Sequence, residues 1–339
     1  MIDPDTFIRG LPKAELHMHL EGSIEPELLL QLADRNSVAL PWDTPEALRA
    51  AYQFHNLQSF LDLYYAGCHV LADEEDFYTI TRAYLQRAHA DAVVRAEVFI
   101  GPQGFTERNV PIAVVMNGVL SAMRDAANED GISAGLLVSA QRHRSEADAL
   151  RLLDSVMPWA DQIAGFGLGG AEVGNPPSRF VRFFRACRER GFRTTAHAGE
   201  EGPASYVREA VELLGVDRID HGNACLDDPA LVRDLAARAI PLTVCPLSNV
   251  RLKVVQSLSG HPLRAMLDAG LHVTINSDDP AYFGGYVNEN FVQCRHTFAL
   301  SVDEIVTLAR NSLAAAFVAA ETVARNVARL DAYVASYQA

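Results

Sequence analysis

The chain has 339 residues, of which 49% are hydrophobic and 21% are charged, and its formal net charge at pH 7 is −14. This length and composition suit a globular protein with a large core, whereas the acidic surface argues against nucleic acid or an anionic membrane as a partner. The five cysteines are scattered and form no Cys-x-x-Cys pair, which favours free thiols in a cytoplasmic protein. Because the sequence shows neither a basic and apolar leader nor an apolar run of about 18 residues, we expect no signal peptide and no membrane span.

The first predicted strand covers residues 14–20 and carries two histidines, His17 and His19. Residues two apart in an extended strand point to the same face, so the two imidazoles project side by side, about 7 Å apart. Two ring nitrogens at this spacing can hold one metal ion. The same pattern also occurs on the solvent face of an edge strand, and the pair alone does not decide between these interpretations.

Helical segments are expected between this strand and the next. Residues 26–36 have a proline in their first turn and leucines at helical spacing, and Thr44 followed by Pro45 marks a second helix start. The aromatic-rich residues 54–65 either belong to an insert that covers the mouth of a site as a lid or serve only to pack helices. Residues 73–92 are expected to form a long amphipathic helix.

Apolar, β-rich runs then alternate with helical segments. Including the first, eight strands are expected, at residues 14–20, 93–100, 134–140, 163–168, 193–197, 218–221, 241–245 and 271–277. Helical segments are expected at residues 111–128, 145–156, 177–190, 204–214, 227–238 and 262–268. Strand–helix alternation means parallel strands with right-handed crossovers, and eight such units close a TIM (β/α)8 barrel.

We expect a single domain over residues 1–339: a barrel with a helical insert after the first strand and a C-terminal helical extension. Ser301 and Glu304 form a capping box at the start of this extension, which is expected to continue as helix to the end. An open doubly wound sheet would also alternate strands and helices, but no Gly-x-Gly-x-x-Gly motif opens a first helix. The glycine-rich residues 165–170 instead end the fourth strand, where backbone must approach a ligand closely.

Polar residues stand at the ends of several predicted strands, where a barrel of this kind has its active site. In addition to His17 and His19, His197 ends the fifth strand, His221 ends the sixth and Asp278 ends the eighth. Imidazoles and a carboxylate suit one divalent ion, zinc in the first place, with iron or manganese as alternatives. Because no cysteine is well placed, a closed structural zinc site is disfavoured.

Two further acids are candidates for proton transfer. Glu200 lies three residues after His197. An acid at this position could also be present only because the helix dipole favours a negative charge near a helix N-terminus. The doublet Asp278-Asp279 lets one carboxylate bind a metal while its neighbour faces the substrate. This arrangement is typical of metal-assisted hydrolysis, in which the ion lowers the pKa of a bound water.

Five motifs in a fixed order now suggest a family. His-x-His-x-x-Gly, His-Ala-Gly-Glu, His-Gly after the sixth strand, Cys-Pro-x-Ser-Asn and Ser-Asp-Asp-Pro resemble the adenosine/adenine deaminase family of the amidohydrolase superfamily. The resemblance implies a barrel that binds one zinc ion through His17, His19, His197 and Asp278.

The resemblance also implies roles in hydrolytic deamination at C6 of a purine. Glu200 would protonate the ring at N1, which requires a pKa raised by desolvation. His221 would orient or deprotonate the attacking water, and Asp279 would contact that water and N7. Gly170 would donate its backbone N–H to N3, and the 6-amino group would leave as ammonia.

Glu21 bears on which purine is the substrate. Adenosine deaminases usually carry aspartate at this position, where it meets the ribose. The longer Glu21 resembles the adenine deaminase branch, in which this side chain would occupy the ribose space. The resemblance therefore implies that a free base, adenine, is converted to hypoxanthine and ammonia, with adenosine as an alternative substrate.

Two stretches depart from that branch. Residues 96–104 end the second strand, and residues 167–172 end the fourth, with glycines where larger or more polar side chains are commoner. Side chains missing from a pocket wall would leave volume for larger substrates. The alternative hypothesis is therefore a deaminase of modified adenines such as N6-methyladenine, N6-isopentenyladenine or 8-oxoadenine.

Other classes of protein fit less well. Amidohydrolases that act on cyclic amides or esters usually need a carboxylated lysine or further histidine at the fourth strand, which here ends in Gly167-Leu168-Gly169. Zinc cytidine-type deaminases are excluded because their signature, His-x-Glu followed by Pro-Cys-x-x-Cys, is absent. A metal-binding protein without catalysis would be expected to lack Glu200 or Asp279. The sequence leaves open whether the chain forms a homo-oligomer.

Overall fold

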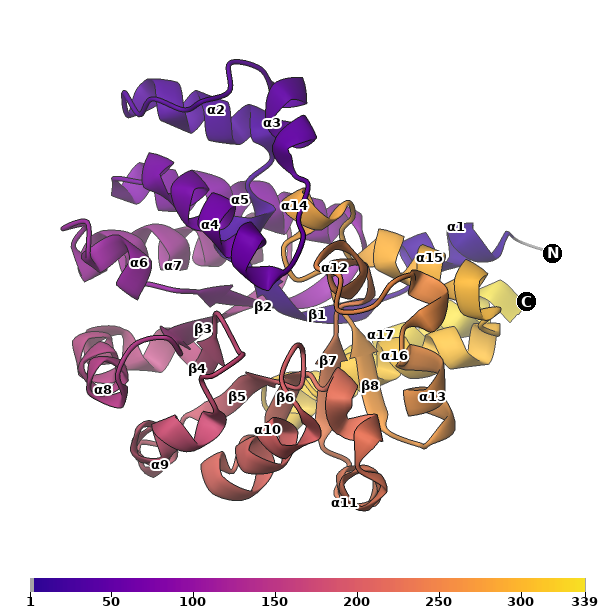
Figure 1. Ribbon diagram of the computed structural model, residues 1–339. Coiled ribbons are helices and arrows are strands. Elements are labelled where there is room, and N and C mark those ends of the chain that lie inside the picture. Colours follow the sequence, from indigo (N-terminus) through magenta and orange to yellow (C-terminus); the bar gives the residue numbers. More distant parts are fainter. Residues whose placement is uncertain (1–2, 339) are drawn as a thin grey trace.

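Eight parallel strands form the centre of the fold, and helices surround them (Figure 1). The structure is a computed structural model that describes residues 3–338. Each strand pairs with the next one in the chain, which confirms the predicted (β/α)8 arrangement. The strands are β1 (Lys13–His19), β2 (Val93–Ile100), β3 (Ser133–Gln141), β4 (Ile163–Gly169), β5 (Arg193–Ala198), β6 (Arg218–His221), β7 (Pro241–Val244) and β8 (His272–Ile275).

The segment after β8 returns to β1 and nearly closes the barrel. Met18 and Asp278 form a parallel bridge. The His19 N–H donates to the Asp278 carbonyl at 2.8 Å, and the Asp278 N–H donates to the His17 carbonyl at 3.0 Å. The first strand is thereby fixed directly to the segment that carries Asp278.

Helices connect the strands and cover the outside of the barrel (Figure 1). They are α1 (Pro4–Gly10), α2 (Pro26–Arg35), α3 (Pro45–Ala51), α4 (Leu57–Gly67), α5 (Glu74–Ala90), α6 (Gln103–Thr106), α7 (Ile112–Glu129), α8 (Glu146–Ser155), α9 (Val181–Glu189), α10 (Ala204–Glu209), α11 (Pro229–Ala237), α12 (Pro246–Arg251), α13 (Leu263–Asp268), α14 (Pro280–Phe283), α15 (Val287–Phe298), α16 (Val302–Ala314) and α17 (Ala320–Gln338). Shorter helical turns lie at Leu20–Ser23, Cys68–Val70, Met157–Gln162, Pro177–Phe180, Ala210–Leu214, Asn223–Asp227 and Leu258–Gly260.

Local sequence signals explain where several helices begin. The Thr44 side chain accepts the N–H of Ala47 at 3.2 Å at the start of α3, as the Thr-Pro pair predicts. Ser301 and Glu304 form the predicted capping box at the start of α16. Helices α2 to α4 form the predicted insert between β1 and β2.

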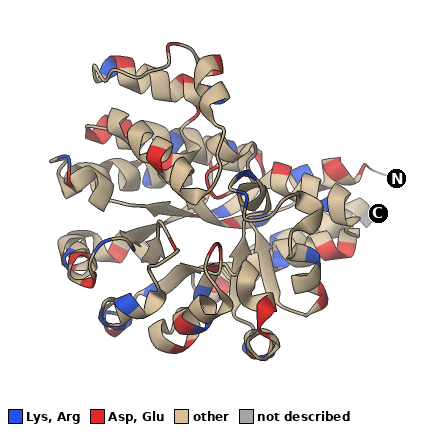
Figure 2. Ribbon diagram, in the orientation of Figure 1, with Lys and Arg blue, Asp and Glu red and all other residues tan. Residues whose placement is uncertain are grey.

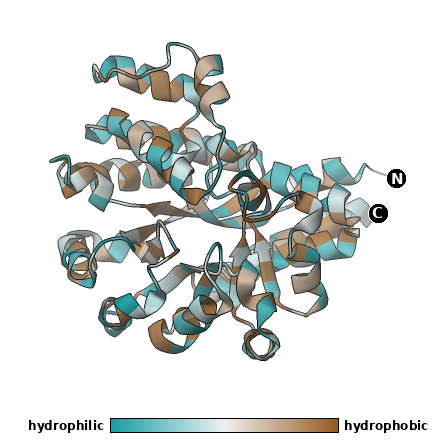
Figure 3. Ribbon diagram, in the orientation of Figure 1, coloured by the Kyte–Doolittle hydropathy of each residue, from teal (hydrophilic) through white to brown (hydrophobic). Residues whose placement is uncertain are grey.

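The core follows the hydropathy of the chain. Hydrophobic residues are frequent in the central strands and alternate with hydrophilic residues along the surrounding helices (Figure 3), whereas acidic and basic residues lie mostly on the helices (Figure 2). Leu16, Val98 and Phe166, for example, are completely buried. Among the described residues, no helix has both the length and the apolar character needed to cross a bilayer.

The C-terminal extension differs from the prediction, because residues 315–319 interrupt the helix between α16 and α17. At this break the Phe317 N–H donates to Glu97 Oε1 at 2.5 Å. The Arg218 guanidinium lies 4.1 Å from the centre of the Phe317 ring and donates to the Ala315 carbonyl at 3.2 Å. The chain leaves the helix here because its backbone and an aromatic ring satisfy buried charges on β2 and β6. The prediction also missed α1, α6, α12, α14 and α15.

Candidate active site

All nine residues proposed from the sequence lie at the carboxyl ends of the strands or in the loops that follow them. They are His17, His19, Glu21, Gly170, His197, Glu200, His221, Asp278 and Asp279. Except for His17, which is completely buried beneath the others, they line a cavity of about 310 Å3. This volume lies at the small end of the range for ligand pockets, about 300–1,000 Å3.

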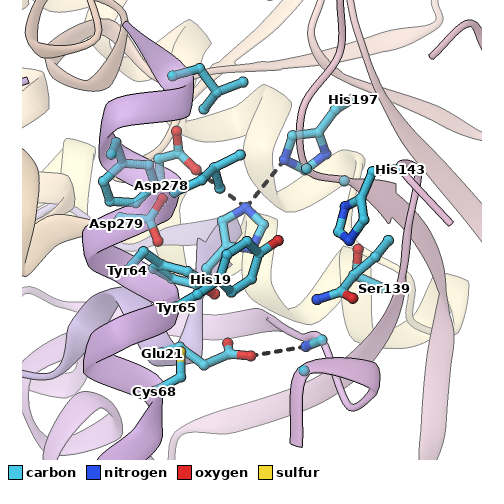
Figure 4. Close-up of a pocket in the computed structure, with 18 of the residues that line it drawn as sticks. His19, Glu21, Tyr64, Tyr65, Cys68, Ser139, His143, His197, Asp278 and Asp279 are labelled. Carbon is cyan, nitrogen blue, oxygen red and sulfur yellow. Dashed lines mark hydrogen bonds and ion pairs between the residues drawn. The ribbon is translucent and has the colours of Figure 1, made fainter. Parts of the chain in front are cut away.

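Helix α4 forms one wall of the cavity. Leu57, Phe60, Tyr64 and Tyr65 of this helix are among the lining residues. Figure 4 shows the two tyrosines beside His19 and Asp279. The aromatic insert therefore lies over the site, as one of the two interpretations expects, while movement of residues 54–65 as a lid remains a prediction.

Ligand atoms of His17, His19, His197 and Asp278 converge beneath the cavity, and Figure 4 shows the last three of these residues. The Nε2 atoms of His17 and His19 each lie 3.2 Å from His197 Nε2. The same two atoms lie 3.4 and 3.3 Å from Asp278 Oδ1. Ligands at about 2.0–2.1 Å from a tetrahedral ion are separated from one another by about 3.4 Å. The observed separations therefore fit a single divalent ion.

The outer partners of these side chains leave the converging atoms with free lone pairs. His17 Nδ1 lies 3.2 Å from the Thr243 carbonyl, and His197 Nδ1 lies 3.3 Å from Asp220 Oδ2. A carbonyl and a carboxylate can only accept, so in the neutral imidazoles that bind a metal each Nδ1 carries the hydrogen and each Nε2 offers its lone pair. Two lone pairs facing each other at 3.2 Å repel unless a cation lies between them. This donor set again fits a metal.

The neighbouring carboxyls Asp278 and Asp279 have opposite character. Burial alone would raise the pKa of Asp278, but the imidazoles of His17 and His19 hold it well below its usual range. The Ser248 hydroxyl donates to Asp278 Oδ2 at 2.6 Å and leaves Oδ1 to face the histidines. Burial and the charge of Asp278 raise the pKa of Asp279 well above its usual range. Such a divergence assigns the ionised and the proton-carrying form to different side chains.

Glu200 is a second buried acid at this site. Its Oε2 lies 3.5 Å from His221 Nε2, and its Oε1 has no hydrogen-bond partner among the described residues. Burial, together with the nearby charges of Asp278 and Glu172, raises the pKa of Glu200 well above its usual range. The raised pKa agrees with the prediction and favours the protonated carboxyl.

A chain of hydrogen bonds assigns the tautomer of His221. The Leu263 N–H donates to His261 Nδ1 at 3.0 Å, so His261 Nε2 carries the hydrogen and donates to Asn249 Oδ1 at 3.0 Å. The Asn249 amide group then faces His221 Nδ1 at 3.4 Å and donates to it. His221 therefore keeps its hydrogen on Nε2, the atom that faces Glu200.

Metal-binding groups defined by proximity alone are broader than the predicted set. His17, His197, His221 and Asp278 offer ligand atoms within 4.8 Å of one another, and His19, Asp278 and Asp279 form a second such group. Both groups share Asp278, so the two sets meet at one place.

His221 and Asp278 have the strained backbone that is common at functional sites. Their φ angles are 63° and 65°, in the left-handed region that side chains other than glycine rarely adopt. In each case this conformation comes where the strand has ended, and it turns the side chain into the barrel mouth.

Glu21 closes the cavity on the side opposite the cluster (Figure 4). Its Oε1 accepts the N–H of Gly101 at 3.0 Å, and its Oε2 is buried without a partner among the described residues. Burial raises the pKa of this carboxyl. Gly170, with φ of +94°, also lines the cavity.

The expectation that the glycines at the end of the fourth strand leave spare volume fails for Gly167 and Gly169, although a Cβ on Gly170 would have its nearest neighbour 3.6 Å away at His143. A Cβ atom on Gly167 would lie 2.7 Å from Cε1 of Phe99, and one on Gly169 would lie 3.2 Å from the Ser139 hydroxyl. Neighbouring side chains already fill this space. By contrast, Gly101 at the end of β2 has room for a Cβ, with its nearest neighbour 3.7 Å away at Glu21.

Sequence reasoning missed the residues that orient the predicted side chains through hydrogen bonds and close polar contacts. They are Asp220, Thr243, Ser248, Asn249 and His261. Their signal lies in the motifs themselves, because Asp220 directly precedes His221 and because Ser248 and Asn249 close the Cys-Pro-x-Ser-Asn motif.

Comparisons with known proteins agree with this geometry. A family described as adenosine deaminase matches residues 12–333. An adenine deaminase from Rhodopseudomonas palustris is 64% identical over 99% of this chain and 98% of its own length. The crystal structure of an adenine deaminase from Arthrobacter aurescens superposes with a TM-score of 0.94 at 49% identity, covering 96% of this chain and 99% of that one. A zinc-bound amidohydrolase from Burkholderia ambifaria has a TM-score of 0.89 at 31% identity, covering 99% and 95%. The chain belongs to the adenosine deaminase family.

Proposed function

We propose that residues 1–339 form one metal-dependent aminohydrolase domain that converts adenine and water to hypoxanthine and ammonia. The observation that carries the proposal is the pairing, in one small cavity, of a convergent set of ligand atoms with a buried acid whose pKa is raised. Similarity to proteins named adenine deaminase over nearly their whole length supports the same substrate.

His17, His19, His197 and Asp278 would hold the ion. His221 is the competing ligand by proximity, but the hydrogen on its Nε2 removes the lone pair that a metal needs. Three imidazoles and one carboxylate suit zinc, and zinc is bound in the related amidohydrolase from Burkholderia ambifaria. When bound, the ion supplies a Lewis acid that lowers the pKa of water at neutral pH.

The remaining residues would bind the purine and move protons. The Glu200 carboxylic acid donates its proton to N1, which makes C6 more electrophilic. The Nε2–H of His221 donates to the oxygen of the attacking water and orients it, and Asp279 contacts this water and N7. The water oxygen adds to C6, which becomes tetrahedral, and the C6–N bond to the amino group then breaks. Of the two water protons, one passes to the amino group, which leaves as ammonia, and the other restores the Glu200 acid. Gly170 offers its N–H to N3.

A free base is favoured over a nucleoside because of Glu21. Its carboxyl is tied to Gly101 at the wall where a ribose would have to fit. Larger N6 substituents are disfavoured because Phe99 and Ser139 fill the space beside Gly167 and Gly169. The open space beside Gly101 lies next to Glu21, on the side opposite the ligand cluster. Because the amine would leave at the ligand cluster, this space would not accommodate a larger N6 substituent.

The test is release of ammonia or amine from five compounds at equal concentration: adenine, adenosine, N6-methyladenine, N6-isopentenyladenine and 8-oxoadenine. We expect adenine to lead the others by at least about a hundredfold in kcat/KM, as a site that pairs its polar groups with one substrate allows. Faster turnover of adenosine or of an N6-substituted base would overturn the substrate assignment, and no turnover of any of the five would overturn the reaction.

A further inference from the structure

Glu172 is a completely buried carboxylate that is not one of the nine residues proposed for the site. It follows β4, two residues after Gly170, and its side chain reaches the loop between β5 and α10. Among residues 3–338 it has no ion-pair partner within 4.0 Å. A buried carboxylate without a counter-ion must be stabilised in another way.

Four consecutive backbone N–H groups provide that stabilisation. Gly199 donates to Glu172 Oε1 at 2.7 Å. The next three residues, Glu200, Glu201 and Gly202, donate to Oε2 at 3.0, 2.8 and 2.8 Å. Successive N–H groups that converge in this way form a nest for an anion, and here the anion is a side chain of the protein itself.

The loop sequence Gly-Glu-Glu-Gly suits this wrapping. Gly199 has φ of +72°, which glycine adopts without strain. A Cβ on Gly202 would lie 2.7 Å from Glu172 Oε1, so only glycine lets the backbone approach the carboxylate this closely. The two glycines therefore place the peptide groups of Glu200 and Glu201 around the carboxylate.

This loop carries Glu200, and its other contacts lie at the neighbouring residues: the Ala224 N–H donates to the Gly199 carbonyl at 3.0 Å, and the Leu57 N–H donates to Glu201 Oε1 at 3.4 Å. His197 belongs to β5, whose position the sheet determines, whereas Glu200 lies beyond the end of the strand. Arg142 holds the same region from the other side, because it donates to the His197 carbonyl at 2.7 Å and to the Asn175 carbonyl at 2.9 Å. The backbone of Glu200 itself is held by Glu172.

We propose that Glu172 is a positioning residue for the reaction: its carboxylate fixes the backbone of residues 199–202 and thereby holds the Glu200 side chain in register with the purine ring. The inference rests on the proposed function, since it takes Glu200 as the acid that protonates the substrate. A displacement of about 1 Å of a reacting group can cost on the order of 10²-fold in rate, so the anchoring of this loop bears directly on turnover.

The Glu172→Gln substitution tests the anchoring. With its oxygen toward three of the N–H groups, the glutamine NH2 would face the Gly199 N–H at about the distance of the present 2.7 Å bond, two donors against each other. The opposite orientation would leave the other three N–H groups facing a donor. The loop must shift in either case, and we expect kcat for adenine to fall on the order of 10²-fold while KM changes by less than about threefold.

A double-mutant cycle separates positioning from a general structural role. If Glu172 acts through Glu200, adding Glu172→Gln to a Glu200→Gln enzyme should lower kcat by less than about threefold. Glu201→Gln is the matched control, because it removes a negative charge from the same loop while its backbone N–H still donates to Glu172. We expect this control to keep wild-type kcat. Metal content and melting temperature are measured for every variant.

The outcomes are distinct. Turnover of adenine by the wild-type enzyme tests the proposed function. If another purine proves to be the substrate, the kcat ratios of variant to wild type are measured with that purine. Wild-type kcat in Glu172→Gln, or a full further loss in the Glu200→Gln background, overturns the positioning role. If Glu172→Gln does not fold, Glu172→Asp, which keeps the charge but shortens the reach to the nest, is carried through the same cycle and decides by the same criteria.

Discussion

His261 provides a prediction whose magnitude follows from the structure. Burial lowers the pKa of His261 to about 4 from its usual 6.5, because the ring lies inside the protein between the Leu263 N–H and Asn249. The unfolded chain therefore takes up a proton on this histidine at higher pH than the folded chain does. Stability must fall as the pH falls from 6.5 through 4, and the full difference corresponds to about 3 kcal/mol.

Substitution of His261 by glutamine should remove this pH dependence. The glutamine amide can still donate to Asn249 but does not titrate in this range. We expect the free energy of unfolding of the wild type to fall by about 2 kcal/mol more than that of His261→Gln between pH 7 and pH 5. Urea denaturation followed by tryptophan fluorescence measures both proteins at both pH values. Taking the difference between the two proteins cancels the contributions of other titrating groups.

His89→Gln, at an exposed position on α5, is the control. It makes the same His→Gln exchange at an exposed site, and we expect it to keep the wild-type pH dependence of stability. An equal loss of stability in the wild type and His261→Gln between pH 7 and pH 5 would refute the reasoning, because it would mean that the folded protein accepts the proton on His261 without cost.

Three further predictions concern the site. Glu200→Gln should lower kcat for adenine at least about a hundredfold while the metal content stays at the wild-type level, and near-normal turnover would remove Glu200 from its role as acid. In Asp220→Asn, the oxygen that accepts from two threonine hydroxyls should stay in place and turn the new NH2 toward His197. The hydrogen on His197 would then move to Nε2, so chelator competition should show a metal affinity lower by about 10- to 100-fold; unchanged affinity would contradict this tautomer. Glu21→Asp should raise the ratio of adenosine to adenine kcat/KM by at least about tenfold, measured by chromatography of the products, and an unchanged ratio would mean that Glu21 does not exclude the ribose.

Local pattern was sufficient to predict the barrel because each strand and helix carries its own signal. The alternation of apolar runs with helical segments identified all eight strands, and capping residues such as Thr44 and Ser301 located helix starts. The strand ends were less certain. β8 stops at Ile275 rather than continuing to residue 277, because the chain must turn so that Asp278 can pair with β1.

The break at Phe317 could not be predicted in the same way. The sequence there has helical propensity, and the reason for the break is a contact with Glu97 and Arg218, more than 90 residues away in the chain. Tertiary contacts of this kind override local preference.

For the site as well, the sequence predicts residues that stand at strand ends but not residues that act through contacts distant in the chain. His17, His197 and Asp278 could be proposed because they stand at strand ends, where the barrel architecture itself brings side chains together. Asp220 and Asn249 act through the tautomers of neighbouring histidines, and these depend on distances that no spacing in the sequence reveals. Phe99 misled the prediction for the opposite reason, since the space beside Gly167 looked empty only because the residue that fills it lies on another strand.

The contact between the C-terminal segment and the floor of the barrel has a consequence for biosynthesis. Arg218 and Glu97 are completely buried, and their partners include the Ala315 carbonyl and the backbone and ring of Phe317. A nascent chain that has not yet released residues 315–317 from the ribosome leaves the Arg218–Glu97 ion pair without these additional partners, and a buried ion pair with incomplete hydrogen bonds is destabilising. All eight strands are then already synthesised, yet the barrel cannot reach its final stability. We therefore expect the barrel to reach its final stability only after residues 315–317 have been synthesised and have packed against Arg218 and Glu97.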